Sequence, residues 1–394
     1  MLCSSRHALI RATPAITKSN LAPLVATRSF ASASNDKVAI KLPKDSFKTF
    51  KCEAPSLEVD IKKNDLLDMY KSMVIMRRME TTADGLYKAG LIRGFCHLCT
   101  GQEAVGVGME SALTDEDKVI TAYRAHGFTY MRGGTIHSIL AELLGRGTGI
   151  SKGKGGSMHM FTPRFFGGNG IVGAQVPLGT GIAFAQKYLN RKAATFTFYG
   201  DGAANQGQVF ESFNMAKLWD LPCVFVCENN QYGMGTSADR SSASTEYYKR
   251  AEYIPGIKVN GMDIIAVHQA IAHAREWTLS GKGPLVLEME TYRYAGHSMS
   301  DPGTSYRNRD EIQKMRADHD AITGLKDRLL EHKLITEDEV KALDKAARAE
   351  VDKIAEKVKA DPEPDLKEFW ENVYVKGTEV PFLRGREPDV IHRY

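Results

Sequence analysis

Two short polar segments follow apolar, strand-like runs in the middle of the chain. Gly200-Asp201-Gly202 comes directly after the run at 194–199, and Asn229-Asn230 comes just after the run at 222–227. The carboxyl ends of parallel strands meet at one edge of a sheet, and ligands bind there, so we expect the two segments to lie together. The Asp201 carboxylate, the Asn230 amide oxygen and a backbone carbonyl just beyond would suit Mg²⁺ that also holds a diphosphate.

Each segment has an ordinary alternative interpretation. Gly-Asp-Gly alone is a common turn, and Asn-Asn is a common strand end. The pair is more specific, because 26 residues containing one predicted helix lie between the two segments. A second motif, at 168–173, matches the dinucleotide fingerprint by its letters. That fingerprint requires a preceding strand, whereas 161–166 is interrupted by Pro163 and is predicted to be a loop. We therefore do not expect an NAD site.

Alternating strands and helices would position these segments. The pattern predicts strands over 194–199, 222–227 and 284–291, and helices over 206–220 and 263–280. Such alternation predicts an α/β fold whose mostly parallel central sheet is flanked by helices on both faces.

Two further helices are predicted outside this alternation. One covers 64–90, with Asn64 as its N-cap and Gly90 at its end. The other is amphipathic and covers 336–358, opened by a Thr336–Glu339 capping box. Glycine is concentrated at 145–181, among aromatic residues and His159. This composition indicates backbone that approaches a ligand closely, not a flexible linker.

The first 35 residues are rich in Arg, Ser and Ala and contain no acid. This composition is typical of a mitochondrial transit peptide, which we expect at 1–30 with cleavage after Phe30. An extended N-terminal arm at 31–63 and a single domain at 64–394, helical from about 310 to 394, would follow. The net charge of +4 comes largely from the leader, so we expect no nucleic-acid partner. We expect no membrane span, because no apolar run reaches about 18 residues.

Cys96 and Cys99 form a CxxC pair, which could indicate zinc or redox chemistry. Zinc would need two more ligands, and Cys223 and Cys227 fall inside an apolar run. In a reducing compartment we expect buried free thiols instead.

Nearly the whole mature chain resembles the alpha subunits of the thiamine diphosphate-dependent 2-oxoacid dehydrogenases. The motifs that carry the resemblance lie at 94–99, 123–127, 153–159, 168–177, 200–235 and 294–303. The resemblance implies the thiamine diphosphate-binding fold, with thiamine diphosphate and Mg²⁺ as cofactors. The segment 203–208 favours the pyruvate enzymes over the branched-chain 2-oxoacid enzymes, which remain the alternative. The implied reaction is oxidative decarboxylation of pyruvate with reductive acetylation of a lipoyl group. A catalytically inactive homologue that holds a partner is the other alternative.

The resemblance also assigns roles to single residues. It implies that Asp201, Asn230 and the Tyr232 carbonyl bind the metal, and that His97 and His297 serve proton transfer in the substrate pocket. Met234 would hold the cofactor in its bent form. The remaining implied cofactor contacts are Tyr123, Arg124, Gly170, Val172, Gly200, Gly202, Ala203 and His297.

Partners and regulation follow from the same resemblance. The carboxylate that activates the cofactor would come from a beta subunit, in an assembly of two alpha and two beta subunits in the mitochondrial matrix. The lipoyl domain of the acetyltransferase component would receive the acetyl group. Ser298, Ser305 and Ser237 match inhibitory phosphorylation positions, which implies a kinase and a phosphatase. A phosphate on Ser298 would place about −1.5 to −2 charge beside His297.

Overall fold

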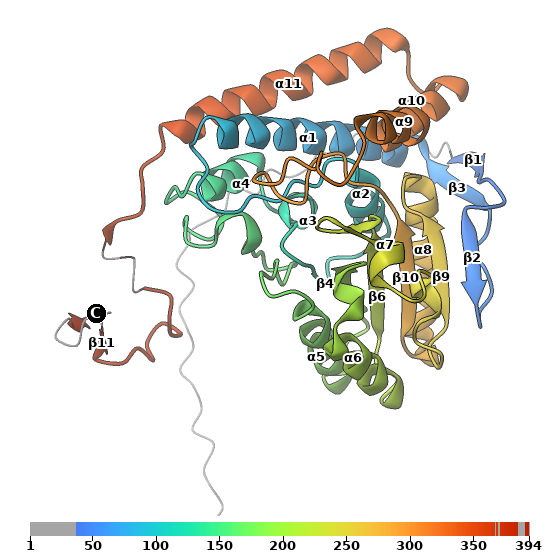
Figure 1. The fold of residues 1–394 in the computed structure, drawn as a ribbon, viewed down its shortest axis with the longest axis horizontal. Coiled ribbons are helices and arrows are strands. Elements are labelled where there is room, and N and C mark those ends of the chain that lie inside the picture. The colour runs from blue at the N-terminus through green and yellow to red at the C-terminus, as the bar shows by residue number, and fades with distance from the viewer. Residues whose placement is uncertain (1–36, 367, 369–370, 385–390, 394) are drawn as a thin grey trace, which may run out of the picture. The chain divides into compact units, whose positions relative to one another are not determined.

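The computed structural model describes residues 37–366, 368, 371–384 and 391–393 (Figure 1). The predicted transit peptide at 1–30 and the first residues of the predicted arm, 31–36, lie outside the described residues. No helix within the described ranges is long and apolar enough to cross a membrane.

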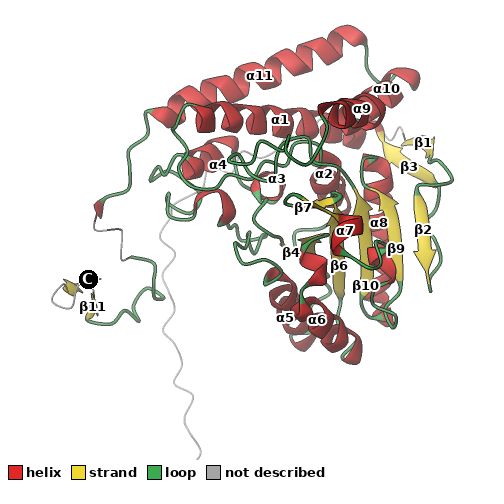
Figure 2. Ribbon diagram, viewed as in Figure 1, coloured by secondary structure: helices red, strands yellow, loops and turns green. Residues whose placement is uncertain are grey.

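A six-stranded sheet forms the centre of the domain, and its strand order is β2-β9-β10-β6-β5-β4 (Figure 2). Five strands run parallel, and β2 pairs antiparallel with β9 at one edge. The predicted parallel sheet is therefore confirmed. The strands are β2 (Phe47–Phe50), β4 (Lys118–Ile120), β5 (Thr195–Gly200), β6 (Cys223–Asn229), β9 (Gly256–Asn260) and β10 (Leu285–Glu290).

The helices and the short turns of helix fall between and around these strands. The α-helices are α1 (Lys63–Lys88), α2 (Glu103–Ala112), α3 (His126–Met131), α4 (Ile136–Leu143), α5 (Gln175–Tyr188), α6 (Gly207–Leu218), α7 (Ala238–Ser241), α8 (Ile264–Trp277), α9 (Arg309–His319), α10 (Ala321–Glu331) and α11 (Glu337–Lys359). The short 3₁₀ turns cover Gly156–Met158, Ala203–Asn205 and Tyr247–Lys249.

Side chains of β6 alternate between two hydrophobic cores. Val224 and Val226 join the core that contains α2 and α8. Phe225 and Cys227 join the core that contains α5 and α6. Because successive side chains of a strand point to opposite faces, this division shows that helices cover both faces of the sheet (Figure 1).

The predicted extended arm is largely strand. Residues Lys37–Lys41 (β1) and Glu58–Lys62 (β3) form an antiparallel pair, and β2 between them completes the central sheet. The predicted N-cap at Asn64 is wrong: α1 follows β3 without a turn, its N-cap is Lys62, and no side chain caps it. Asp65 in the first turn still offsets the helix dipole.

The C-terminal helices pack on α1. A third core joins α1, α4 and α11, and α1 and α11 lie side by side in Figure 2. The capping box of Thr336 with Glu339 is present as predicted. The helical part is shorter than the predicted 310–394, because α11 ends at Lys359 and the strands β11 (Phe382–Arg384) and β12 (Ile391–Arg393) follow it.

The glycine-rich segment folds around a carboxylate of the chain itself. Glu142 is fully buried at the end of α4, and its two oxygens accept hydrogen bonds from the backbone N–H groups of Ser151, Gly153, Gly155 and Gly156 at 2.7–3.0 Å. A Cβ on Gly155 would lie 1.9 Å from the His159 carbonyl oxygen, so only glycine fits there. In the first part of 145–181, the backbone therefore approaches the Glu142 side chain of the same chain, and not a bound ligand as predicted.

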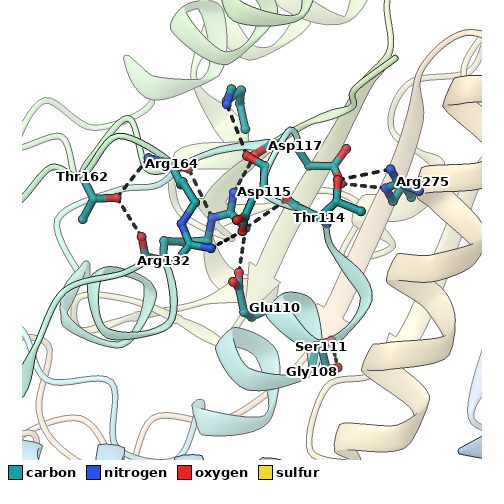
Figure 3. A network of polar contacts seen from close by, with 11 residues as sticks. Gly108, Glu110, Ser111, Thr114, Asp115, Asp117, Arg132, Thr162, Arg164 and Arg275 are labelled. Carbon is teal, nitrogen blue, oxygen red and sulfur yellow. Dashed lines mark hydrogen bonds and ion pairs between the residues drawn. The ribbon is translucent and has the colours of Figure 1, made fainter. Parts of the chain in front are cut away.

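A buried polar network fixes the start of β4 (Figure 3). The Arg132 guanidinium is fully buried, donates to Glu110 at 2.9 Å and also donates to the Asp117 carbonyl at 2.6 Å. The Asp117 carboxylate accepts from the Ala194 N–H at 2.9 Å and from Arg275 at 2.7 Å. These bonds tie together the end of α3, the starts of β4 and β5, and α8.

Candidate active site

The two polar segments meet at the carboxyl edge of the sheet, as predicted. In the parallel pair of β5 and β6, Gly200 is in register with Glu228, so Asp201 and Asn229-Asn230 leave neighbouring strands at the same level. Both Asp201 and Asn230 are buried. A Cβ on Gly202 would come within 3.1 Å of the Gly233 Cα, which shows how closely the two loops approach.

Asp201 has the features of a cation ligand. Its Oδ2 atom is buried and has no hydrogen-bond partner among the described residues. Burial raises the pKa of Asp201 to about 6, and backbone N–H groups, including that of Asn230, act in the opposite direction. A buried carboxylate oxygen without a donor is costly unless a cation or a proton neutralises it.

Two further oxygens face one buried cation, Arg293. Its Nη1 donates to the Asn230 Oδ1 at 3.3 Å and to the Tyr232 carbonyl at 3.0 Å. Its Nη2 donates to the Met234 carbonyl at 3.1 Å. The Asn230 Oδ1 and the Tyr232 carbonyl oxygen, which are the other two implied metal ligands, therefore both point toward a positively charged group. Hard oxygen ligands of this kind fit Mg²⁺.

Three rings form a cluster on loops close to these ligands. The centroids of His97 and Tyr123 are 4.5 Å apart, and His297 lies 5.3 Å from each of them. Burial, and then Arg124, lower the pKa of His97 to about 2 and that of His297 to about 4. Both imidazoles are thus neutral near neutral pH. Their Nδ1 atoms are buried and unpartnered among the described residues.

The loop with His97 is oriented by its apolar neighbours. Cys96 and Leu98 are buried in the core of α1, α4 and α11, so His97 between them faces the other way. The Cys99 thiol donates to Glu80 at 3.1 Å, and the cysteines of the CxxC pair are free.

Arg124 joins the two histidine loops. It is buried, and its guanidinium donates to the Leu98 carbonyl and, at 3.1 Å, to the His297 carbonyl. These bonds use two of the five N–H donors that a guanidinium carries, so donors remain for a phosphate.

The other implied cofactor contacts differ in exposure: Gly170, Val172 and Met234 are exposed, whereas Ala203 is buried. Gly170 and Val172 are exposed on the loop before α5, and the Val172 carbonyl accepts from Gln208 at 3.2 Å. Ala203 begins the turn that leads to α6. Met234 is 61% exposed and has a positive φ of 59°, which presents its side chain on the surface of the loop.

Comparison with known proteins identifies the family of this chain. Residues 71–367 match the model of the family described as "Dehydrogenase E1 component". The chain belongs to this family.

Relatives of this E1 chain are similar over nearly their whole length. It is 63% identical to the mitochondrial pyruvate dehydrogenase E1 component subunit alpha of Saccharomyces cerevisiae, over 90% of this chain and 85% of the relative. The subunit of that name from Chaetomium thermophilum is 56% identical, over 99% and 96% of the two chains. The somatic form from Rattus norvegicus is 52% identical, over 92% and 91%. Membership of the family implies thiamine diphosphate as the cofactor.

The three serines of this E1 chain differ in exposure. Ser298 is 7% exposed, and its hydroxyl is 2.9 Å from that of Ser300. Ser305 is exposed, and Ser237 is half-buried in β8 (Thr236–Ser237), which pairs with β7 (Tyr232–Gly233). Asp301 holds the loop around Ser298 by accepting from the His297 N–H at 2.7 Å and from the Tyr306 hydroxyl.

Some residues of the site were not predicted from the sequence. Arg293 follows the end of β10, and an arginine just beyond a third parallel strand was the signal that could have found it. Gln102 accepts a hydrogen bond from the Asn230 amide, and Glu228 in turn accepts one from Gln102. They lie on distant segments, and the sequence holds no signal that pairs them.

Proposed function

We propose that this chain is the alpha subunit of a mitochondrial pyruvate dehydrogenase, the acetyl-transferring component of its complex. The observation that carries the proposal is 52–63% identity over most of the chain to proteins of that name from fungi and a mammal. The reaction would be decarboxylation of pyruvate and reductive acetylation of a lipoyl group. Buried Asp201 and Asn230 at the sheet edge, with the histidine cluster near them, support the proposal.

Asp201, Asn230 and the Tyr232 carbonyl would bind Mg²⁺, which in turn would hold the cofactor diphosphate. The unpartnered Asp201 Oδ2 and the two oxygens facing Arg293 support this assignment. Arg124, with Tyr123 beside it, would add positive charge to the diphosphate end. Gly170 and Val172 would offer backbone groups to the aminopyrimidine, and Met234 would support the bend of the cofactor.

Thiamine diphosphate, when bound, supplies the nucleophilic carbon and the electron sink for decarboxylation. The chain itself supplies two neutral histidines. His97 and His297 are neutral near pH 7, because burial and Arg124 lower their pKa values. Each ring therefore offers one nitrogen as an acceptor and one N–H as a donor, and we assign to them the proton transfers in the substrate pocket. The ring of Tyr123 packs against both and limits how far they can turn.

A beta subunit would complete the enzyme as an assembly of two alpha and two beta chains, and would supply the carboxylate for the pyrimidine. An exposed apolar surface on α5 and α6 supports a tightly bound partner, because monomers rarely expose such patches. Its residues are Leu178, Phe184, Tyr188, Leu189, Leu218 and Trp219.

The lipoyl domain of the acetyltransferase component would approach the histidine cluster, and a kinase and phosphatase would act at Ser298, Ser305 and Ser237. A phosphate on Ser298 would force charge into a buried position beside His297 and disrupt the loop that Asp301 holds. We also propose a transit peptide at 1–30 and a location in the mitochondrial matrix, in keeping with the names of the relatives.

The test is co-expression of this chain with a beta subunit, followed by measurement of 2-oxoacid-dependent reduction of an artificial electron acceptor. We expect activity with pyruvate that requires thiamine diphosphate. Higher kcat/KM with branched-chain 2-oxoacids would contradict the pyruvate assignment and leave the cofactor assignment intact. Absence of activity with every 2-oxoacid, in an assembly that binds thiamine diphosphate, would favour the structural homologue.

A further inference from the structure

An asparagine amide can ligate a metal only with its oxygen, so its orientation matters. Oδ1 can bind a cation, whereas the Nδ2 amino group has only hydrogens to offer. A rotation by half a turn about the last bond of Asn230 would exchange the two. The side chain is buried, so contacts with other protein groups decide which end faces the metal ligands.

Asn230 is held from its far side by Gln102. The Asn230 Nδ2 donates to the Gln102 Oε1 at 3.1 Å, and the Gln102 Nε2 donates to the Glu228 Oε1 at 3.2 Å. All three side chains are buried. The three groups therefore form one chain of hydrogen bonds, Glu228–Gln102–Asn230.

This chain of hydrogen bonds has one direction, and both of its ends agree with it. At one end, the Glu228 Oε1 accepts from the amino end of Gln102. The oxygen end of Gln102 then faces Asn230 and requires its amino end in turn. This leaves the Asn230 oxygen on the side of Arg293, a donor-only group that bonds to it at 3.3 Å.

The backbone keeps Gln102 in place for this task. It is the N-cap residue of α2, and its N–H donates to the Cys99 carbonyl at 2.9 Å. Gly101 before it has a φ of +95°, and a Cβ there would lie 2.3 Å from the Tyr292 carbonyl oxygen. The loop is thus pressed against the segment that carries Arg293.

We propose that Gln102 is a positioning residue for the metal site: with Glu228 it fixes the Asn230 amide so that its oxygen faces the cation. This inference rests on the proposed Mg²⁺ site. Groups that hold metal ligands in orientation commonly change metal affinity by about 10- to 100-fold when they are replaced.

The test is Mn²⁺ binding to the alpha–beta assembly with saturating thiamine diphosphate, followed by the electron paramagnetic resonance signal of free Mn²⁺. The variant Gln102→Met removes the acceptor of the Asn230 amino group at similar size and unchanged charge, and we expect the Kd for Mn²⁺ to rise at least about tenfold. The double variant Gln102→Glu/Glu228→Gln exchanges the positions of the amide and the carboxylate at unchanged total charge. Gln at 228 can donate to Glu at 102, which still accepts from Asn230, so we expect Kd to stay within about threefold of the wild type.

Each outcome bears on a different assignment. If Gln102→Met binds Mn²⁺ like the wild type, or the double variant binds no better than Gln102→Met, the positioning role is wrong. Asp201→Ala is the reference, and unchanged Mn²⁺ affinity in that variant would overturn the metal site itself. If Gln102→Met does not assemble, Gln102→Asn decides: it keeps the amide but shortens the side chain by one methylene group, so its oxygen no longer reaches the Asn230 amino group and Kd should rise about threefold or more. An unchanged Kd in Gln102→Asn would overturn the inference.

Discussion

The candidate active site has two sides that are held in different ways. One side holds the proposed metal ligands, and we call it the metal side: Asp201 and Asn230 follow β5 and β6, whose register sets their relative height. On the histidine side, His97 and His297 lie on loops that Arg124 and Asp301 tie together. The metal side is thus fixed by the sheet, whereas the two histidine loops are joined by a backbone hydrogen bond from the Met299 N–H to the Cys96 carbonyl and by a few side chains that bond to loop backbone. Changes to those few side chains should disturb catalysis and leave metal binding intact.

The largest expected effect comes from a charge on the histidine side. Ser298→Glu places a carboxylate at a site that is 7% exposed, and we expect kcat/KM for pyruvate to fall on the order of 50-fold, which corresponds to about 2 kcal/mol. Mn²⁺ affinity should stay within about threefold of the wild type. The exposed Ser305→Glu is the matched control and should lose less activity. Parallel loss of Mn²⁺ affinity in Ser298→Glu would show that the two sides are not separable.

A second prediction concerns the carboxylate under the glycine-rich loop. In Glu142→Gln an amino group replaces an oxygen that accepts two backbone N–H groups, so donors face donors. We expect the free energy of unfolding to fall by about 2 kcal/mol in chemical denaturation. The exposed Glu211→Gln on α6 is the control. A change in Glu142→Gln below about 0.5 kcal/mol would mean that the loop does not depend on this anion.

Arg124→Lys tests the link between the histidine loops. A lysine keeps the charge but lacks the planar fork that reaches both the Leu98 and the His297 carbonyls. We expect kcat to fall about tenfold, while the Kd for thiamine diphosphate changes by less than about threefold, because the charge near the diphosphate remains. Arg93→Lys, at an exposed arginine, serves as the control. An unchanged kcat in Arg124→Lys would show that the guanidinium is not needed to hold the two histidine loops in their catalytic arrangement.

The smallest effect is a dependence of stability on pH. Folding lowers the pKa of His97 from 6.5 to about 2, so below pH 6.5 the unfolded chain binds a proton that the folded chain excludes. Stability therefore falls as the pH falls, by about 1 kcal/mol for this group between about pH 6.5 and 5.5. We expect His97→Asn to show a shallower loss of unfolding free energy over that interval. Identical slopes in the two proteins would contradict a neutral, buried His97.

The sequence predicted the parts of the molecule that depend on local patterns. The apolar runs of β5 and β6 placed Asp201 and Asn230 at one edge, because strand direction and register follow from alternating strands and helices. The capping box at Thr336 was equally local. Asn64 was misjudged as an N-cap, since β3 passes directly into α1 and no turn precedes the helix.

Contacts between distant segments could not be predicted in the same way. Glu142 looks like an ordinary helix residue, and only the fold brings the amides of 151–156 onto it. Gln102 and Asn230 are separated by 128 positions, and their hydrogen bond depends on how the start of α2 is placed near the residues that follow β6. The orientation of each amide is therefore a property of the assembled core.

The two edges of the central sheet limit how copies of this chain can join. At one edge β2 runs against its neighbour and is only Phe47–Phe50 long, and at the other edge β4 spans only Lys118–Ile120. A short edge strand offers few free backbone N–H and C=O groups to a strand of another molecule, so continuous extension of the sheet from molecule to molecule is disfavoured. We expect copies to associate through the helices that cover the sheet, where symmetric contacts can form a closed assembly of defined size.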